Sequence, residues 1–183
     1  MKKLLLLTSL LTLSNLSHAL ISMNIEPIVG YERVQKLIPE RHTKDRLVYG
    51  ARLSLGIPLV SVEASYLRAN DTEDFTDLGL SIKDTTDKAQ LGLRSSIKLL
   101  GVLRASARAG GQASLNVHEE TLNGVTRKDI ETLKVHPYAG AGLIFQLGKL
   151  FQFRADLTTV FVEFPNFNNN EYQLTAGFAV KFP

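Results

Sequence analysis

The chain has 183 residues, a formal net charge of +3 and no cysteine. This length favours a single domain. The absence of cysteine excludes disulfides, thiolate catalysis and cysteine-based zinc sites. The small net charge, with no cluster of Lys and Arg among aromatic residues, argues against nucleic acid as a partner.

The first nineteen residues have the features of a secretory signal peptide. The basic pair Lys2-Lys3 precedes an apolar run from Leu4 to Leu13, and Ser17-His18-Ala19 fits a small-x-small cleavage site. A transmembrane anchor is the alternative, but a spanning helix needs about 20 apolar residues and this run is shorter. We therefore predict a cleaved signal peptide at 1–19, export from the cytoplasm and a mature domain at 20–183. Cleavage leaves 21 − 2 = 19 basic against 18 acidic residues.

The remainder of the chain alternates between apolar and polar residues with a period of two, the pattern of strands with one apolar face. It predicts eight strands, at 21–32, 46–57, 60–68, 88–99, 102–115, 132–147, 150–162 and 172–182. Pro27 and Pro137 lie inside two of them, and neither can donate to a ladder. We expect a bulge or a locally unpaired position at each.

The connections between these strands alternate in length. Short ones fall at 57–59, 100–101 and 148–149, and long polar ones at 33–45, 69–87, 116–131 and 163–171. This arrangement predicts an all-β, antiparallel up-and-down eight-stranded transmembrane β-barrel with short periplasmic turns and long extracellular loops. Leu78, Leu80 and Ile82 also alternate, so whether 75–83 extends a hairpin above the rim stays open. A ninth separate strand would spoil the even count of a bacterial barrel.

Alternation alone also fits a soluble β protein with one wet face. The polar face, however, is rich in small residues, which suit the crowded interior of an eight-stranded cylinder. The residues concerned are Gly50, Gly56, Gly92, Gly110, Gly140, Gly142 and Gly177, with Ser54, Ser61, Ser65, Ser96 and Ser106. The apolar face carries no charge within the predicted strands, as a lipid-facing surface requires. Aromatic residues fall near both strand ends, which is typical of two interfacial girdles.

The last strand resembles the C-terminal assembly signal of bacterial outer-membrane barrels, an alternating apolar strand that closes on Phe. The residues that carry this resemblance are Tyr172, Leu174, Phe178, Val180 and Phe182. The family usually ends on the aromatic residue, whereas here Pro183 follows it. With eight strands, the chain resembles the small outer-membrane barrels of the OmpA, OmpX and OmpW type. The resemblance implies location in the bacterial outer membrane, contact with outer-membrane lipid and lipopolysaccharide, and insertion by the barrel-assembly machinery.

Seven inward charges lie five to seven residues from a short turn or from the mature N-terminus. That spacing corresponds to a height on the order of 12–18 Å, so they are expected to share one layer near mid-membrane. They are Glu26, Arg52, Glu63, Arg94, Arg108, Arg154 and Asp156. Arg104, Lys134 and His136 add further polar groups to the predicted lumen. Such a layer is either an anion-favouring selectivity filter or a plug of mutually paired charges, and the narrow lumen favours the plug.

These observations lead to three hypotheses. The first is an integral outer-membrane barrel with a narrow, charge-plugged lumen, acting as a structural or surface-interaction protein. The second is a low-conductance, anion-preferring porin-like pore, with homo-oligomerisation through small outward residues such as Ala105, Ala107 and Ala109 as an open alternative. The third is a soluble periplasmic β-barrel that binds a small ligand. Neither an enzyme, a cofactor nor a metal is expected, because no Ser or carboxylate stands beside His136 in sequence and no phosphate or metal motif occurs.

Overall fold

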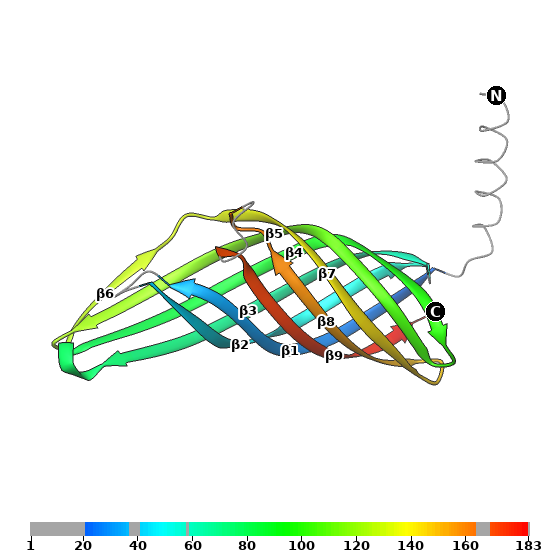
Figure 1. Cartoon of the computed structure of the whole chain (residues 1–183), viewed down its shortest axis with the longest axis horizontal. Coiled ribbons are helices and arrows are strands. Elements are labelled where there is room, and N and C mark those ends of the chain that lie inside the picture. The colour runs from blue at the N-terminus through cyan, green and yellow to red at the C-terminus, as the bar shows by residue number, and fades with distance from the viewer. Residues whose placement is uncertain (1–20, 37–40, 58, 164–168, 183) are drawn as a thin grey trace, which may run out of the picture.

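The computed structural model describes residues 21–36, 41–57, 59–163 and 169–182 (Figure 1). The predicted signal peptide and Pro183 lie outside these residues. The strands are β1 (Ser22–Lys36), β2 (His42–Gly56), β3 (Val60–Phe75), β4 (Leu80–Leu100), β5 (Leu103–Leu122), β6 (Val125–Ile130), β7 (Lys134–Leu147), β8 (Phe151–Val160) and β9 (Glu171–Phe182). A single 3-10 turn, η2 (Thr76–Leu78), joins β3 to β4.

The strands form one antiparallel sheet that closes on itself. The ring order is β1, β2, β3, β4, β5, β7, β8, β9, and β9 pairs with β1 from Met23↔Phe182 to Arg33↔Tyr172. Within the described chain, β6 pairs only with the upper part of β5, and the two form a hairpin that stands above the ring. The ring itself therefore has eight strands. The predicted up-and-down eight-stranded barrel is confirmed. The number of strands in the ring stays even, because β6 lies outside it.

The predicted long loops were mostly wrong, since strand pairing continues through much of 33–45, 69–87 and 116–131. Pairs run up to Lys36↔His42 and Phe75↔Leu80, and β5 reaches Leu122. Above the apolar band both faces of a strand are wet, so polar residues occupy both and the period-two signal disappears while the ladder persists. The open question about 75–83 is answered: β3 and β4 extend a hairpin above the rim. The predicted loop 163–171 lies partly outside the described residues.

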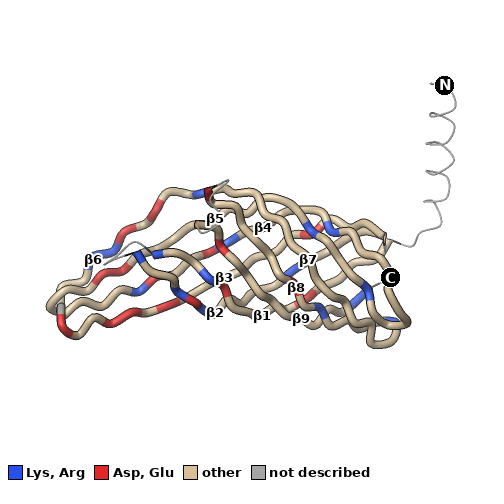
Figure 2. The backbone as a smooth tube through the Cα atoms, in the orientation of Figure 1, with Lys and Arg blue, Asp and Glu red and all other residues tan. Residues whose placement is uncertain are grey.

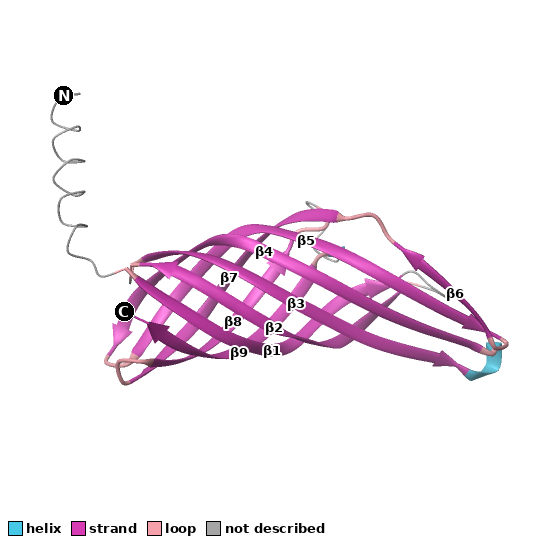
Figure 3. Ribbon diagram, turned by 180° about the vertical axis from the view of Figure 1, so that it is seen from behind, coloured by secondary structure: helices cyan, strands magenta, loops and turns pink. Residues whose placement is uncertain are grey.

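The upper parts of β3, β4, β5 and β6 project from the barrel as a four-stranded sheet (Figures 1 and 3). We call residues 71–75, 80–87, 115–122 and 125–130 the projecting sheet. Its last hairpin turns at Asn123-Gly124, where φ is +48° and +85°. Two positive φ angles match the right-handed twist of the flanking strands, and Asn and Gly accept them at low cost. The outer edge of β6 has no partner strand in the described chain.

Both strand prolines lie where a ladder is interrupted or ends. The β1–β9 pairs stop at Ile25↔Val180 and resume at Ile28↔Gly177 without a change of register, so Pro27 sits in an unpaired gap and no bulge forms. Pro137 stands one residue beyond the β7–β8 ladder, which begins at Tyr138↔Val160, although its carbonyl accepts a hydrogen bond from the Phe161 amide. The sheet therefore loses little from the missing amide hydrogens.

The two faces of the sheet have opposite character. On β8, for example, Gln152, Arg154 and Asp156 are buried, while Phe153 and Leu157 are exposed. Apolar side chains face outward all around the ring, with Leu91 64% and Leu93 57% exposed. So extensive an exposed apolar surface marks contact with lipid or protein. In the described residues, no helix has the length and apolar character needed to cross a membrane.

Outward aromatic side chains gather near both ends of this apolar surface. Tyr31, Tyr49 and Tyr66 are exposed towards the long-loop rim, and Phe151 and Phe182 towards the short-turn rim. Phe151 stacks on Phe178 of the neighbouring strand, with ring centroids 5.4 Å apart. The predicted assembly-signal strand is β9, on which Tyr172, Leu174, Phe178 and Phe182 face outward; Val180 has the same parity and is partly covered.

Candidate functional site: the charged lumen

The seven charges of the predicted layer are all buried inside the barrel, at most 4% exposed. They form one unbroken chain of ion pairs in which arginine and carboxylate alternate. Its order is Arg154, Glu26, Arg52, Asp156, Arg94, Glu63 and Arg108. We call this chain the lower layer. Because it begins and ends on arginine, four guanidinium groups face three carboxylates and the layer has a net charge of +1.

Asp156 is the centre of the lower layer. Its carboxylate accepts hydrogen bonds from Arg52 Nη1 at 2.6 Å and from both terminal nitrogens of Arg94 at 2.9 and 3.0 Å. Arg94 Nε also donates to Glu63 Oε2 at 2.7 Å. Each carboxylate thus lies between two arginines, which keeps the buried negative charge compensated. Arg108 additionally lies over the Tyr138 ring, 4.8 Å from its centroid.

The bridges of the lower layer cross the barrel. Asp156 stands on β8, whereas Arg52 and Arg94 stand on β2 and β4, each three positions away around the ring of eight. A contact between strands this far apart has to pass through the lumen. The ion pairs of the lower layer therefore cross the lumen from one wall to another.

A glutamine cluster lies above the lower layer. Gln90 donates from Nε2 to the side-chain oxygens of Gln112 and Gln173, at 2.7 and 3.1 Å. Gln173 Nε2 in turn donates to Gln112 at 3.1 Å. Arg108 Nη2 donates to Gln90 Oε1 at 2.8 Å and joins this cluster to the lower layer. Beside it, an apolar cluster of Ile28, Val48, Leu67 and Ala69 fills the lumen face of β1, β2 and β3.

A second set of buried charges, the upper layer, lies near the long-loop end of the lumen and consists of Glu32, Arg46, Lys88 and Glu171. Lys88 Nζ donates to Glu32 at 2.6 Å and to Glu171 at 2.7 Å, and Arg46 Nε donates to Glu32 at 2.6 Å. Sequence reasoning missed this layer because Arg46 and Lys88 stand at the ends of the predicted strands, farther from the short turns than the five to seven residues that define the lower layer. The continued inward parity from Arg52 to Arg46, and from Arg94 to Lys88, could have found it.

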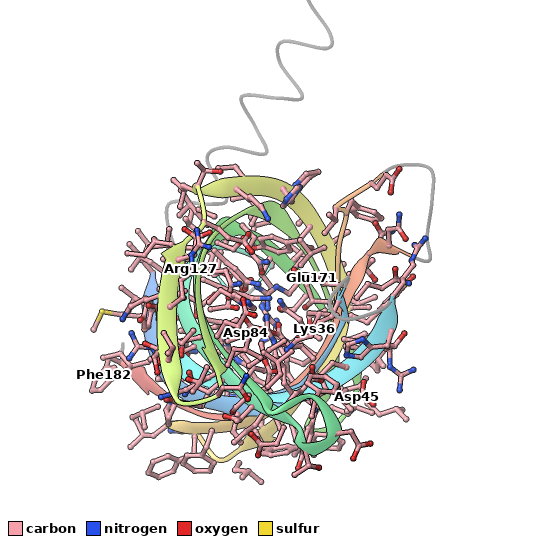
Figure 4. The ribbon with its side chains drawn as sticks, turned by 90° about the vertical axis from the view of Figure 1, so that its left-hand side faces the viewer. Lys36, Asp45, Asp84, Arg127, Glu171 and Phe182 are labelled. Atoms are coloured by element: carbon pink, nitrogen blue, oxygen red, sulfur yellow. The ribbon has the colours of Figure 1, made fainter. Side chains whose placement is uncertain are left out.

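The long-loop mouth of the barrel holds an open cavity of about 330 Å³. Figure 4 looks into this mouth, with Lys36, Asp84 and Glu171 around the opening and Asp45 on the outside. Lys36 Nζ lies 2.7 Å from Asp84, and His118 Nδ1 lies 2.7 Å from the same carboxylate. Partial burial raises the pKa of Asp84, but the hydrogen bonds with Lys36 and His118 outweigh it, and the pKa is lowered from its ordinary value.

The three further residues predicted for the lumen have different positions. Arg104 lies partly buried at the short-turn end of β5, and His136 lies partly buried near the long-loop end of β7. Lys134 lines the open cavity at the long-loop mouth, where its side chain is 55% exposed and pairs with Glu131. Its inward parity is right, but β7 begins at this residue, so the wall around it is incomplete. In the described part of the chain, no group of His, Asp and Glu could hold a metal ion.

No family model matches the chain, and no curated protein matches it. Solved structures do. Neisserial surface protein A has a TM-score of 0.63 and 13% identity over 88% of this chain and 97% of its own. Ail, the attachment invasion locus protein of Yersinia pestis, has a TM-score of 0.59 and 12% identity over 88% of this chain and 98% of its own. The N-terminal β-barrel domain of OprF from Pseudomonas aeruginosa has a TM-score of 0.56 and 16% identity over 88% of this chain and 97% of its own. The fold is that of the small eight-stranded outer-membrane β-barrels.

Proposed function

We propose that the protein is an integral outer-membrane barrel with a lumen closed by side chains, and that it acts as a structural or surface-interaction protein. The observation that carries this proposal is the set of bridges across the lumen, from Arg52 and Arg94 to Asp156 and from Lys88 to Glu171. A solute or ion would have to break several buried ion pairs in turn to pass, and breaking one such pair costs about 3–5 kcal/mol.

Membrane placement follows from the outward apolar surface with aromatic residues at both ends, which fits a lipid-embedded barrel. In that placement the short turns face the periplasm and the long-loop end faces outward. The projecting sheet then stands outside the cell. Within the described chain, its β6 edge has no partner strand and can offer its backbone groups to an extended segment of another protein, the geometry of recognition by strand addition. This is the surface on which we place the interaction.

The charge of the long-loop half constrains the partner. Segments 32–46, 68–88, 116–136 and 159–172 hold 11 basic and 15 acidic residues, a net charge of −4. Ail, one of the structurally similar proteins, has been crystallised with the heparin analogue sucrose octasulfate, a polyanion. The net negative charge here disfavours a polyanion and favours a neutral or basic protein segment. Structural neighbours named as surface and attachment proteins support a non-enzymatic role.

Conductance across a planar bilayer tests the closed lumen. The refolded protein is expected to give no discrete openings, with folding verified by heat-shifted mobility on a gel. Discrete openings that prefer anions would contradict the plug and favour the porin-like alternative, in which the net +1 of the lower layer acts as a filter. Solubility of the folded protein in buffer without detergent would contradict the membrane placement itself and favour the soluble ligand-binding alternative.

A further inference from the structure

The short-turn rim of the barrel is basic and lacks acidic side chains. Lys98, Arg104, Lys149 and Lys181 belong to the strand ends and the turn at this rim. Figure 2 shows Lys and Arg segments at this end of the barrel. In the described residues between the lower layer and the turns, 21–25, 53–57, 59–62, 95–107, 143–153 and 177–182, there is no Asp or Glu. The rim therefore carries four positive side-chain charges, whereas the long-loop half has a net charge of −4.

These four charges span half of the ring, from β4 to β9. Lys98 stands on β4, Arg104 on β5, Lys149 on the β7–β8 turn and Lys181 on β9, while the short-turn ends of β1, β2 and β3 carry none. Backbone hydrogen bonds connect the turns and strand ends that carry these charges. The Gln146 amide donates to Val102 O at 2.8 Å, and the Lys181 amide donates to Leu150 O at 2.7 Å. The positive charges thus share one continuous arc of the rim.

Two of these cations are placed directly opposite each other. Lys98 and Arg104 are paired residues in the β4–β5 ladder, and both have inward parity. Like charges in directly opposite positions destabilise a strand pair. A cavity of about 340 Å³ opens between the β4–β5 and β7–β8 turns, lined by Lys98, Arg104, Gln146 and the turn residues Gly101, Val102 and Gly148. An anion held in this cavity would weaken the repulsion and accept hydrogen bonds from the cations and from the side-chain amide of Gln146.

The turns around this cavity are apolar. Leu100 is 75% exposed, and Leu99, Val102, Leu147 and Leu150 are also exposed. Turns in water are usually polar, so these side chains hold the rim in the membrane interface, with the long lysine stems reaching to the headgroup level. The anion nearest to this rim is therefore the phosphate of a lipid rather than a phosphate in free solution.

We propose that the cavity lined by Lys98 and Arg104 binds the phosphate group of an anionic phospholipid in the leaflet that faces the short turns, and that Lys149 and Lys181 on the same half of the rim add attraction at longer range. The headgroup enters the cavity between the β4–β5 and β7–β8 turns, and the acyl chains lie along the outward apolar residues of the same strands. This proposal rests on the membrane placement proposed above and adds to it a defined lipid site. Electrostatic attraction of anionic lipid is worth about fivefold in affinity per basic residue.

Calorimetric titration of the refolded full chain in a neutral detergent tests the proposal. The probes are short-chain phosphatidylglycerol, short-chain phosphatidylcholine as a headgroup without net charge, and inorganic phosphate. The variant Lys98→Gln/Lys149→Gln/Lys181→Gln removes three charges of the arc. The matched control Lys83→Gln/Arg127→Gln/Lys128→Gln removes three exposed charges from the projecting sheet at the opposite end.

We expect phosphatidylglycerol to bind the wild type at least tenfold more tightly than phosphatidylcholine, a preference lost in the first variant and kept in the control. Equal affinity for the two lipids, or an unchanged preference in the first variant, would overturn the proposal. Inorganic phosphate that binds as tightly as phosphatidylglycerol would identify a site for free anions and overturn the lipid assignment. If the triple variant does not give the folded gel band, the turn variant Lys149→Gln is expected to weaken phosphatidylglycerol by about fivefold. Failure of the wild type to require detergent would instead contradict the membrane placement.

Discussion

Lys88 on β4 and Glu171 on β9 form an ion pair across the full width of the barrel, with Lys88 Nζ 2.7 Å from the Glu171 carboxylate. The two strands are four positions apart in a ring of eight, so they lie opposite each other. Lys88 also pairs with Glu32 on β1 and is completely buried. One lysine therefore connects three strands through the lumen, and the upper layer depends on its charge.

Replacement of Lys88 by Gln is expected to destabilise the barrel by about 3–5 kcal/mol, because Glu32 and Glu171 lose a buried partner. Urea unfolding in detergent or lipid vesicles measures the change. The matched control is Lys83→Gln on the same strand, whose side chain faces outward and is 57% exposed; its effect should stay within about 0.5 kcal/mol. Equal stability of the two variants would contradict the structural role of the upper layer.

The variant Asp156→Asn distinguishes a lumen closed by paired charges (a plug) from an anion-selective pore (a filter). In a plug, the variant leaves Arg52 and Arg94 with reduced compensation and destabilises the barrel by about 3–5 kcal/mol without creating ion selectivity. Asp45→Asn is the control, because Asp45 pairs with Arg33 on the exposed outer face and such pairs are worth about 0–1 kcal/mol. A stable Asp156→Asn variant with altered anion preference in a bilayer would favour the porin-like alternative.

The alternation of residues was enough to predict the barrel and its seven lower-layer charges, because a wall between lipid and a crowded lumen imposes opposite chemistry on alternate residues. That constraint ends above the apolar band, where both faces of a strand contact water. The projecting sheet was accordingly taken for loops, although Asn123-Gly124 is the strongest short-range signal of a hairpin. The cross-barrel pairings, such as Arg94 with Asp156, depend on shear and side-chain reach, and no local pattern in one sequence encodes them.

The pH dependence of the mouth follows from Asp84. Its folded pKa is lowered, so its contribution to stability is present above the ordinary pKa of about 4 and is lost as the pH falls through the folded value. We expect the upper part of β4 to open more readily as the pH falls below about 4, measured as amide exchange corrected for intrinsic rates. In Asp84→Asn this extra opening should be absent at low pH and the local stability lower at neutral pH. An identical pH profile in the variant would show that Asp84 is not the responsible group.

The β5–β6 hairpin is expected to unfold independently of the barrel when its turn is strained. Gly124 has φ of +85°, a conformation that a β-branched residue adopts only at a cost of about 1–2 kcal/mol. Gly124→Val should therefore raise amide exchange in β6, which pairs only with β5 in the described chain, while the urea midpoint of the barrel stays unchanged. Gly111→Val is the control, because Gly111 has no neighbouring atom within 4 Å of an added Cβ and its φ is not positive. If Gly124→Val shifts the barrel midpoint as well, the projecting sheet and the ring form one cooperative unit, and strand addition at β6 would have to act on a rigid edge.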